Sequence, residues 1–117
     1  MPRTGLIVAK PNLVRDGLQA VLSAIPGIQA LEPADDEIGA ADRLKSLPDL
    51  VVLGSSLAED VLHTILETIK EHYPGVRCIV VASDPQQRRV FEAAGADAVL
   101  VEGCSAEVLS ATIRTLL

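Results

Sequence analysis

The stretch DLVVLGSSLAED, from Asp49 to Asp60, decides how the chain is expected to fold. It begins with an aspartate, continues as a short apolar run and stops at Gly54 and two serines. An apolar run without alternation is typical of a strand that is covered on both faces of a parallel sheet. The residues that follow such a strand lie at the edge of the sheet where α/β proteins place their sites. Here that edge receives a glycine, which has no side chain.

Similar apolar runs predict strands over residues 5–9, 78–82 and 98–101, and a weaker candidate over residues 27–32 reads as an edge strand. Between the strands, helical patterns cover residues 13–25, 36–47, 57–73, 85–94 and 106–117. The third pattern is the clearest, because its apolar residues recur at spacings of three and four. Asp84 followed by Pro85 predicts the cap and first turn of the fourth helix, and Ser105 predicts the start of the fifth.

Five alternations of strand and helix predict a parallel sheet with helices on both faces, because parallel neighbours require right-handed crossovers. The expected fold is an α/β, flavodoxin-like (βα)5 doubly wound sandwich with strand order 2-1-3-4-5, forming a single domain over residues 1–117. This order places the ends of the first and third strands on either side of a crevice. Any chemistry is therefore expected in the segments that follow the strands, residues 9–12, 54–56, 82–84 and 102–104.

Composition excludes several classes of function. Aromatic residues make up only 2% of the chain, so the core is expected to consist of Val, Leu, Ile and Ala. The net charge of −6 argues against binding of nucleic acid by this domain, because such binding relies on Lys and Arg. The sequence has neither an export signal nor an apolar run of ~18 residues, which predicts a cytoplasmic protein without membrane contact.

The segments after the strands lack the usual chemical motifs. No set of closely spaced glycines follows the first strand, as a phosphate-binding loop would require. Among carboxylates only Glu102 and Asp84 qualify as ligands at this edge, and Lys10 would place an ammonium group beside them. We therefore expect no metal, no cofactor and no enzymatic activity.

Cys78 and Cys104 stand in different contexts, one opening a predicted strand and the other following one. They are expected to be buried or half-buried free thiols rather than a disulfide or a zinc site. Because Cys104 precedes a helix, a redox-sensing thiol is the alternative interpretation of that residue.

Four segments together resemble a known family: NLVRDGLQAVLSAIPGIQ (12–29), PDLVVLGSSL (48–57), EHYPGVRCIVVAS (71–83) and AAGADAVLVEGCSAEVLSATI (93–113). They are similar to the CheY-like receiver domain of bacterial two-component response regulators, nearest the LuxR/NarL-type branch that carries a helix-turn-helix behind the receiver. The resemblance spans essentially the whole chain. Its most specific pieces are LVRDGL in the first helix and AGADAVLV leading through the fifth strand.

The resemblance also implies which positions carry function. The family has an acidic pair that binds Mg²⁺, an Asp that accepts a phosphoryl group, a Thr or Ser that reads the phosphate and a Lys that pairs with it. At these positions the present sequence has Ala9, Lys10, Gly54, Ala82 and Glu102. Phosphoryl transfer to a carboxylate needs both the carboxylate and a metal, so the resemblance implies a pseudo-receiver that is not phosphorylated.

A shift of the alignment by one residue would place Ser55 or Ser83 at the strand end, but it would not restore a metal site. Ser55 and Ser56 are interpreted as caps of the following helix. For Lys10 and Glu102 we consider an ion pair across the crevice, with two solvated side chains as the alternative.

Two functions remain. The first is an interaction module for signal transduction and transcription regulation, which controls a protein partner or a DNA-binding output domain, the latter either beyond residue 117 or elsewhere, and acts as a homodimer. Receivers relay signals through the face of helix 4, strand 5 and helix 5, or through dimers of helices 1 and 5, so the expected interface residues are Val90, Val108, Ile113 and Leu116. The second is a small-ligand sensor, because Gly54 and Ala82 would leave room in the vacated pocket.

Overall fold

The computed structural model describes residues 2–117 and contains a five-stranded parallel sheet in the order β2-β1-β3-β4-β5. The strands are β1 (Arg3–Val8), β2 (Ile28–Ala30), β3 (Leu50–Gly54), β4 (Arg77–Ala82) and β5 (Ala98–Val101). The helices are α1 (Leu13–Ala24), α2 (Glu37–Leu44), α3 (Glu59–His72), α4 (Pro85–Ala93) and α5 (Ala106–Leu116). The predicted flavodoxin-like fold and its strand order are confirmed.

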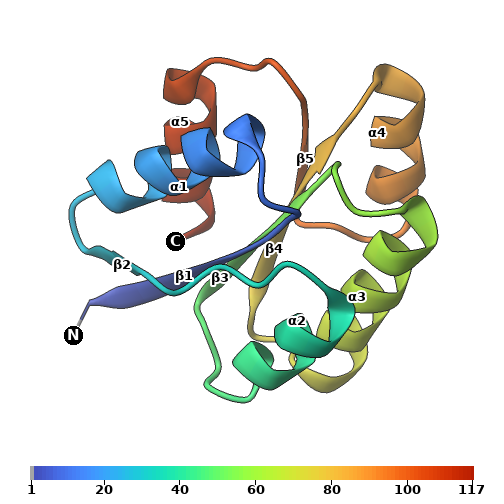
Figure 1. Cartoon of the computed structure of the whole chain (residues 1–117), viewed down its shortest axis with the longest axis horizontal. Coiled ribbons are helices and arrows are strands. Elements are labelled where there is room, and N and C mark those ends of the chain that lie inside the picture. The colour runs from blue at the N-terminus through green and yellow to red at the C-terminus, as the bar shows by residue number, and fades with distance from the viewer. Residues whose placement is uncertain (1) are drawn as a thin grey trace.

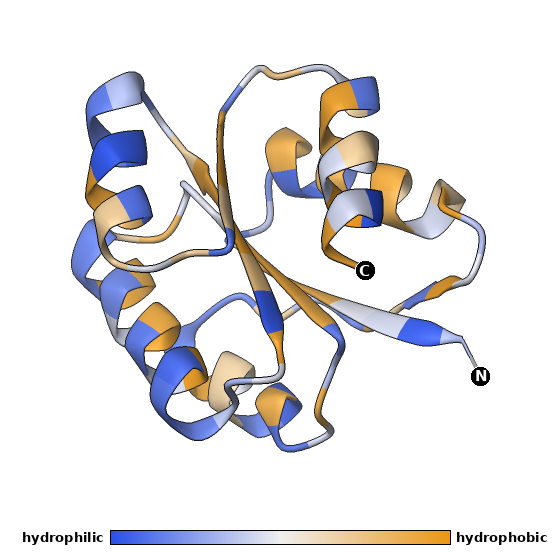
Figure 2. Ribbon diagram, turned by 180° about the vertical axis from the view of Figure 1, so that it is seen from behind, coloured by the Kyte–Doolittle hydropathy of each residue, from blue (hydrophilic) through white to orange (hydrophobic). Residues whose placement is uncertain are grey.

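Helices cover both faces of the sheet: α1 and α5 lie together on one face, and α2, α3 and α4 lie on the other (Figure 1). Each face has its own apolar cluster. Leu6 and Val8 of β1 belong to the cluster under α2, α3 and α4, whereas Ile7 belongs to the one under α1 and α5. The helices turn their apolar stripes toward the sheet and their polar stripes outward (Figure 2). The whole of β3 is buried, as its unbroken apolar run predicts.

Several element ends differ from the prediction. The edge strand is shorter, and α3 begins at Glu59 rather than at Leu57. The N–H of Leu57 donates to the carbonyl of Gly54 over 3.2 Å, which closes a turn and buries the Leu57 side chain before the helix starts. The predicted starts at Asp84 and Ser105 are confirmed, because each side chain accepts a hydrogen bond from the backbone of its helix.

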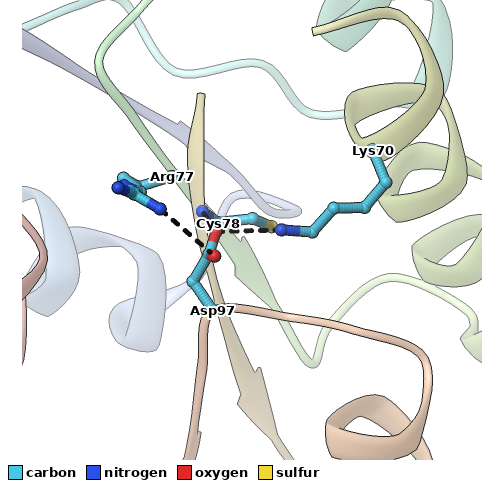
Figure 3. Close-up of polar contacts among 4 residues, drawn as sticks. All are labelled: Lys70, Arg77, Cys78 and Asp97. Carbon is cyan, nitrogen blue, oxygen red and sulfur yellow. Dashed lines mark hydrogen bonds and ion pairs between the residues drawn. The ribbon is translucent and has the colours of Figure 1, made fainter. Parts of the chain in front are cut away.

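One half-buried carboxylate ties three elements together at the amino end of the sheet (Figure 3). Asp97 Oδ2 accepts a hydrogen bond from the backbone N–H of Cys78 over 2.7 Å and one from Lys70 Nζ over 3.1 Å. Arg77 lies 3.8 Å from the other oxygen. Lys70 belongs to α3, Cys78 to β4, and Asp97 precedes β5. This network, which we call the Asp97 network, fixes α3 against the edge of the sheet.

None of the helices described within residues 2–117 is long and apolar enough to cross a bilayer.

Replacing Asp97 by alanine is expected to lower the free energy of unfolding by about 1–3 kcal/mol, because the Lys70 ammonium and the Cys78 N–H lose their partner in a partly buried site. Urea denaturation measures the loss. The matched control is Glu92→Ala, which removes a solvent-exposed pair with Arg88 and should cost at most ~0.5 kcal/mol. Equal losses in the two variants would contradict this account.

Candidate functional site

The carboxyl ends of the strands enclose a cavity of about 130 Å³, which we call the strand-end cavity. It is lined by residues that follow β1, β3, β4 and β5, namely Ala9, Asn12, Val14, Gly54, Ser55, Ser56, Ser83 and Glu102. Of the five residues that the sequence analysis aligned with functional positions, three line this cavity: Ala9, Gly54 and Glu102. Ala82 is fully buried beside it, and Lys10 is exposed at its edge.

Ala9 and Gly54 lie side by side at the centre of the cavity, because β1 and β3 are paired so that Val8 is opposite Leu53. A Cβ atom placed on Gly54 would lie 2.8 Å from the Ala9 Cβ. Carbon atoms in contact are separated by about 3.5–4.0 Å, so a side chain at position 54 would displace Ala9. Gly54 thus has no room for a side chain of its own, whereas the strand-end cavity stays open beside Ala9 and Gly54.

The two serines after β3 do not cap α3, which corrects the sequence interpretation. The cap residue is Ala58, which makes no side-chain cap hydrogen bond. Instead, the Ser55 hydroxyl donates to Glu102 Oε2 over 2.7 Å, and Ser56 Oγ accepts from the backbone N–H of Lys10 over 2.9 Å. The two serines thereby join the loop after β3 to those after β5 and β1, a role that no local sequence signal indicates.

Glu102 is bonded to Ser55 rather than to Lys10. The structure forms no ion pair between Lys10 and Glu102, both of which lie within the described part of the chain. Both residues are exposed, where such a pair would contribute only ~0.2–1 kcal/mol. The mouth of the strand-end cavity is thus crossed by a hydrogen bond between a hydroxyl and a carboxylate.

The donor set of the strand-end cavity does not fit Mg²⁺. That ion is held in proteins by carboxylates and substrate phosphates in octahedral geometry, and Glu102 is the only carboxylate in the cavity lining. Across residues 2–117 no group of three or more His, Cys, Asp or Glu side chains is placed to hold a metal. The lining offers serine hydroxyls without a neighbouring histidine, so it supplies hydrogen bonds but no activated nucleophile.

A second cavity, of about 250 Å³, lies next to the first between α1 and α5. We call it the rim cavity. Its lining consists of Val14, Gly17, Leu18, Val21, Val81, Glu102, Gly103, Cys104, Ser105, Ala106 and Leu109. Glu102 borders both cavities. The sequence analysis missed the rim cavity, although a glycine in the first helix and another after the fifth strand are visible signals of it.

The two thiols differ strongly in their exposure to solvent. Both are free, as predicted, but Cys104 is exposed rather than half-buried, because it lies in the loop at the mouth of the rim cavity. Cys78 is fully buried in β4, and burial raises the pKa of its thiol to about 12. A redox-sensing role for Cys104 stays a prediction.

The expected interface residues separate into two groups. Val90 and Val108 are exposed, by 37% and 46%. Ile113 is 1% exposed, because this side of α5 packs on the sheet, and Leu116 packs half-buried against the same cluster. Ile113 is therefore a core residue, which corrects its assignment to a surface. Three exposed apolar side chains were not anticipated: Leu13, Ile38 and Leu47.

Solved structures similar to this chain include receiver domains of response regulators. The receiver domain of the putative response regulator NarL from Mycobacterium tuberculosis superposes with a TM-score of 0.84 at 16% identity, over 97% of this chain and 94% of that one. The receiver domain of an HD domain-containing protein from Pseudomonas fluorescens gives 0.84 at 25% identity, over 99% and 87%. The response regulator RcsB from Salmonella typhimurium gives 0.81 at 17% identity, over 99% of this chain but only 62% of RcsB.

No model of a known family and no curated protein matches the sequence. The likeness to solved structures therefore establishes the receiver fold of this chain, and its function has to be argued from the site.

The contact between Ala9 and Gly54 predicts a coupled pair of substitutions. Gly54→Ala is expected to cost about 1–3 kcal/mol by overpacking, because the backbone of Gly54 is outside the left-handed region and only the Ala9 methyl opposes a side chain. Ala9→Gly alone should cost roughly 1 kcal/mol, since it removes a buried methyl group. The double variant should lose less free energy of unfolding than the sum of the two single losses. Urea denaturation of all four proteins gives this coupling, and strict additivity would show that the two residues do not compete for space.

Proposed function

We propose that this chain is an atypical receiver domain that acts without phosphorylation, as an interaction module in signal transduction and transcription regulation. The observation that carries the proposal is the close approach of Ala9 to Gly54: a Cβ atom at position 54 would lie 2.8 Å from the Ala9 Cβ, so a side chain there would have to displace Ala9. The receiver fold supports the regulatory role.

Three features of the strand-end cavity support independence from phosphate. The end of β3 supplies Gly54, Ser55 and Ser56 to the cavity and no carboxylate, so there is no carboxylate nucleophile for phosphoryl transfer. The segment after β1 supplies Ala9 and the cation Lys10 instead of metal ligands, so the negative charge of a phosphoryl group would not be neutralised by Mg²⁺. Glu102 places a negative charge where the family has a lysine, and this charge would repel a phosphate. For the same reasons the domain is proposed to be non-enzymatic.

The proposed partner is a second copy of the chain, together with a DNA-binding output domain that is either attached or separate. A groove of about 410 Å³ runs between α1 and α5, and most of its lining is apolar or small: Val21, Ala24, Ile25, Ala106, Glu107, Ser110, Ala111 and Arg114. Apolar grooves on small domains are frequent interaction sites. The domain is expected to work in the cytoplasm without contacting nucleic acid itself, since its net charge is −6.

The face that carries Val90 on α4 and Val108 on α5 is the alternative interface. Both side chains are exposed, but neither belongs to the lining of the α1–α5 groove. The groove is favoured because it adjoins the rim cavity, with which it shares Val21 and Ala106.

Treatment with acetyl phosphate and Mg²⁺ is expected to leave the protein without a phosphoryl adduct, because the strand-end cavity has neither the nucleophile nor the metal ligands. Intact mass spectrometry at acid pH and at neutral pH measures this. A receiver that retains its phosphoacceptor, treated in parallel, is the positive control. An adduct mapped to Ser55 or Ser83 would refute the proposal.

Sedimentation equilibrium is expected to show a dimer that Ala111→Glu dissociates, because the substitution puts a charge into the α1–α5 groove. Val90→Glu on α4 is the matched control and should leave the dimer intact. If the Val90 variant dissociates the dimer and the Ala111 variant does not, the interface lies on α4. A monomer at all concentrations would refute self-association.

A further inference from the structure

We propose that the rim cavity between α1 and α5 binds a small aromatic molecule that carries a cationic amine. The rim cavity shares Val14 and Glu102 with the strand-end cavity and Val21 and Ala106 with the α1–α5 groove, but most of its lining belongs to neither. The argument rests on how the walls of the cavity are built and on the charge at its mouth.

The walls are apolar, and two glycines leave the space open. Leu18 and Val21 of α1 face Leu109 of α5 across the cavity, with Val81 of β4 at its floor. Gly17 and Gly103, which also line the cavity, are exposed, and a Cβ atom on either would meet no neighbouring side chain within 4 Å, so the cavity is open to solvent on this side. Apolar walls with a few polar groups at one end are typical of small-ligand sites, and a volume of about 250 Å³ suits a small ring system.

The mouth of the cavity carries one carboxylate with unused bonding capacity. Glu102 Oε2 accepts the hydrogen bond from Ser55, whereas Oε1 accepts none from the residues that the structure describes. Lys10, which the sequence suggested as a counter-ion, does not pair with Glu102. An ionised carboxylate on the wall of an apolar cavity favours a ligand with a positively charged N–H donor, because charge-assisted hydrogen bonds are stronger than neutral ones.

The surroundings favour a cation as well. Asp16 lies in the first turn of α1 and Glu107 in the first turn of α5, the two helices that form the walls. The whole chain has a net charge of −6. The net charge attracts a cationic ligand at long range, and at the mouth the attraction comes from Glu102, since neither Asp16 nor Glu107 lines the rim cavity.

The same observations argue against a ligand in the strand-end cavity. That cavity is about half as large, at about 130 Å³ against about 250 Å³, and three serines make its lining more polar. The expected small-ligand site therefore moves from the vacated pocket to the cavity on the other side of Glu102.

Tryptamine and indole-3-acetate test the proposal, because they share a ring system and differ in charge. At millimolar concentration, tryptamine should raise the melting temperature and slow the reaction of Cys104 with a maleimide, since Cys104 lines the cavity. Cys78 is buried with a raised pKa, so it will not contribute to the reaction while the protein is folded. Indole-3-acetate should have a much smaller effect on both readouts. Absence of both effects with tryptamine, or equal effects of the two compounds, would overturn the proposal.

Two kinds of variant locate the site. Gly17→Leu and Ala106→Leu each put a side chain at the cavity wall and should abolish the effects of tryptamine, whereas Ala20→Leu, on the exposed side of α1, should not. Glu102→Gln should weaken the binding of tryptamine by about two- to fivefold, as expected for the loss of one exposed ion pair. The affinities of tryptamine and indole-3-acetate should therefore differ less in this variant. Unchanged binding in both cavity-filling variants would place the ligand elsewhere and refute the site.

Discussion

Ala9 and Gly54 lie side by side where β1 and β3 end, and the character of the strand-end region follows from how little space separates them. Parallel pairing of β1 with β3 brings the two residues together, and a side chain on either strand uses space that the other would need. The methyl group of Ala9 occupies the place that a Cβ atom at position 54 would need, so the wall of the strand-end cavity is apolar at this point. The proposal that the domain is not phosphorylated rests on this crowding.

The surroundings of Glu102 differ from those of a residue that faces a phosphate. It stands on the wall between two cavities, bonded to Ser55 on one side and open to an apolar space on the other. Its charge makes phosphate binding unfavourable at the strand-end cavity and cation binding favourable at the rim cavity. One carboxylate thus supports both the proposal that phosphate is not the input and the proposal that a cationic ligand can be bound. The proposed dimer groove begins directly beyond the rim cavity.

The fold could be predicted from the sequence because four of the five strands contain an uninterrupted apolar run and the helices, α3 most clearly, carry apolar stripes. The segment 49–60 alone indicated a buried strand that ends at a glycine. What could not be predicted depends on distances between segments that are far apart in the chain. Ser55 meets Glu102 across 47 positions, and the Ala9 methyl meets Gly54 only through strand pairing. Ile113 was expected at the interface because the apolar stripe of α5 does not show which of its residues pack on the sheet.

The central claim is that the strand-end cavity cannot hold a phosphoryl group and its metal. The most direct measurement is a titration of the isotopically labelled protein with Mg²⁺ and beryllofluoride, followed by amide correlation spectra. The account predicts no saturable shift at the amides of Lys10, Ser55, Ser83 and Glu102. A saturable shift confined to these residues would contradict it, because it would mean that the cavity binds a phosphoryl mimic despite the contact between Ala9 and Gly54.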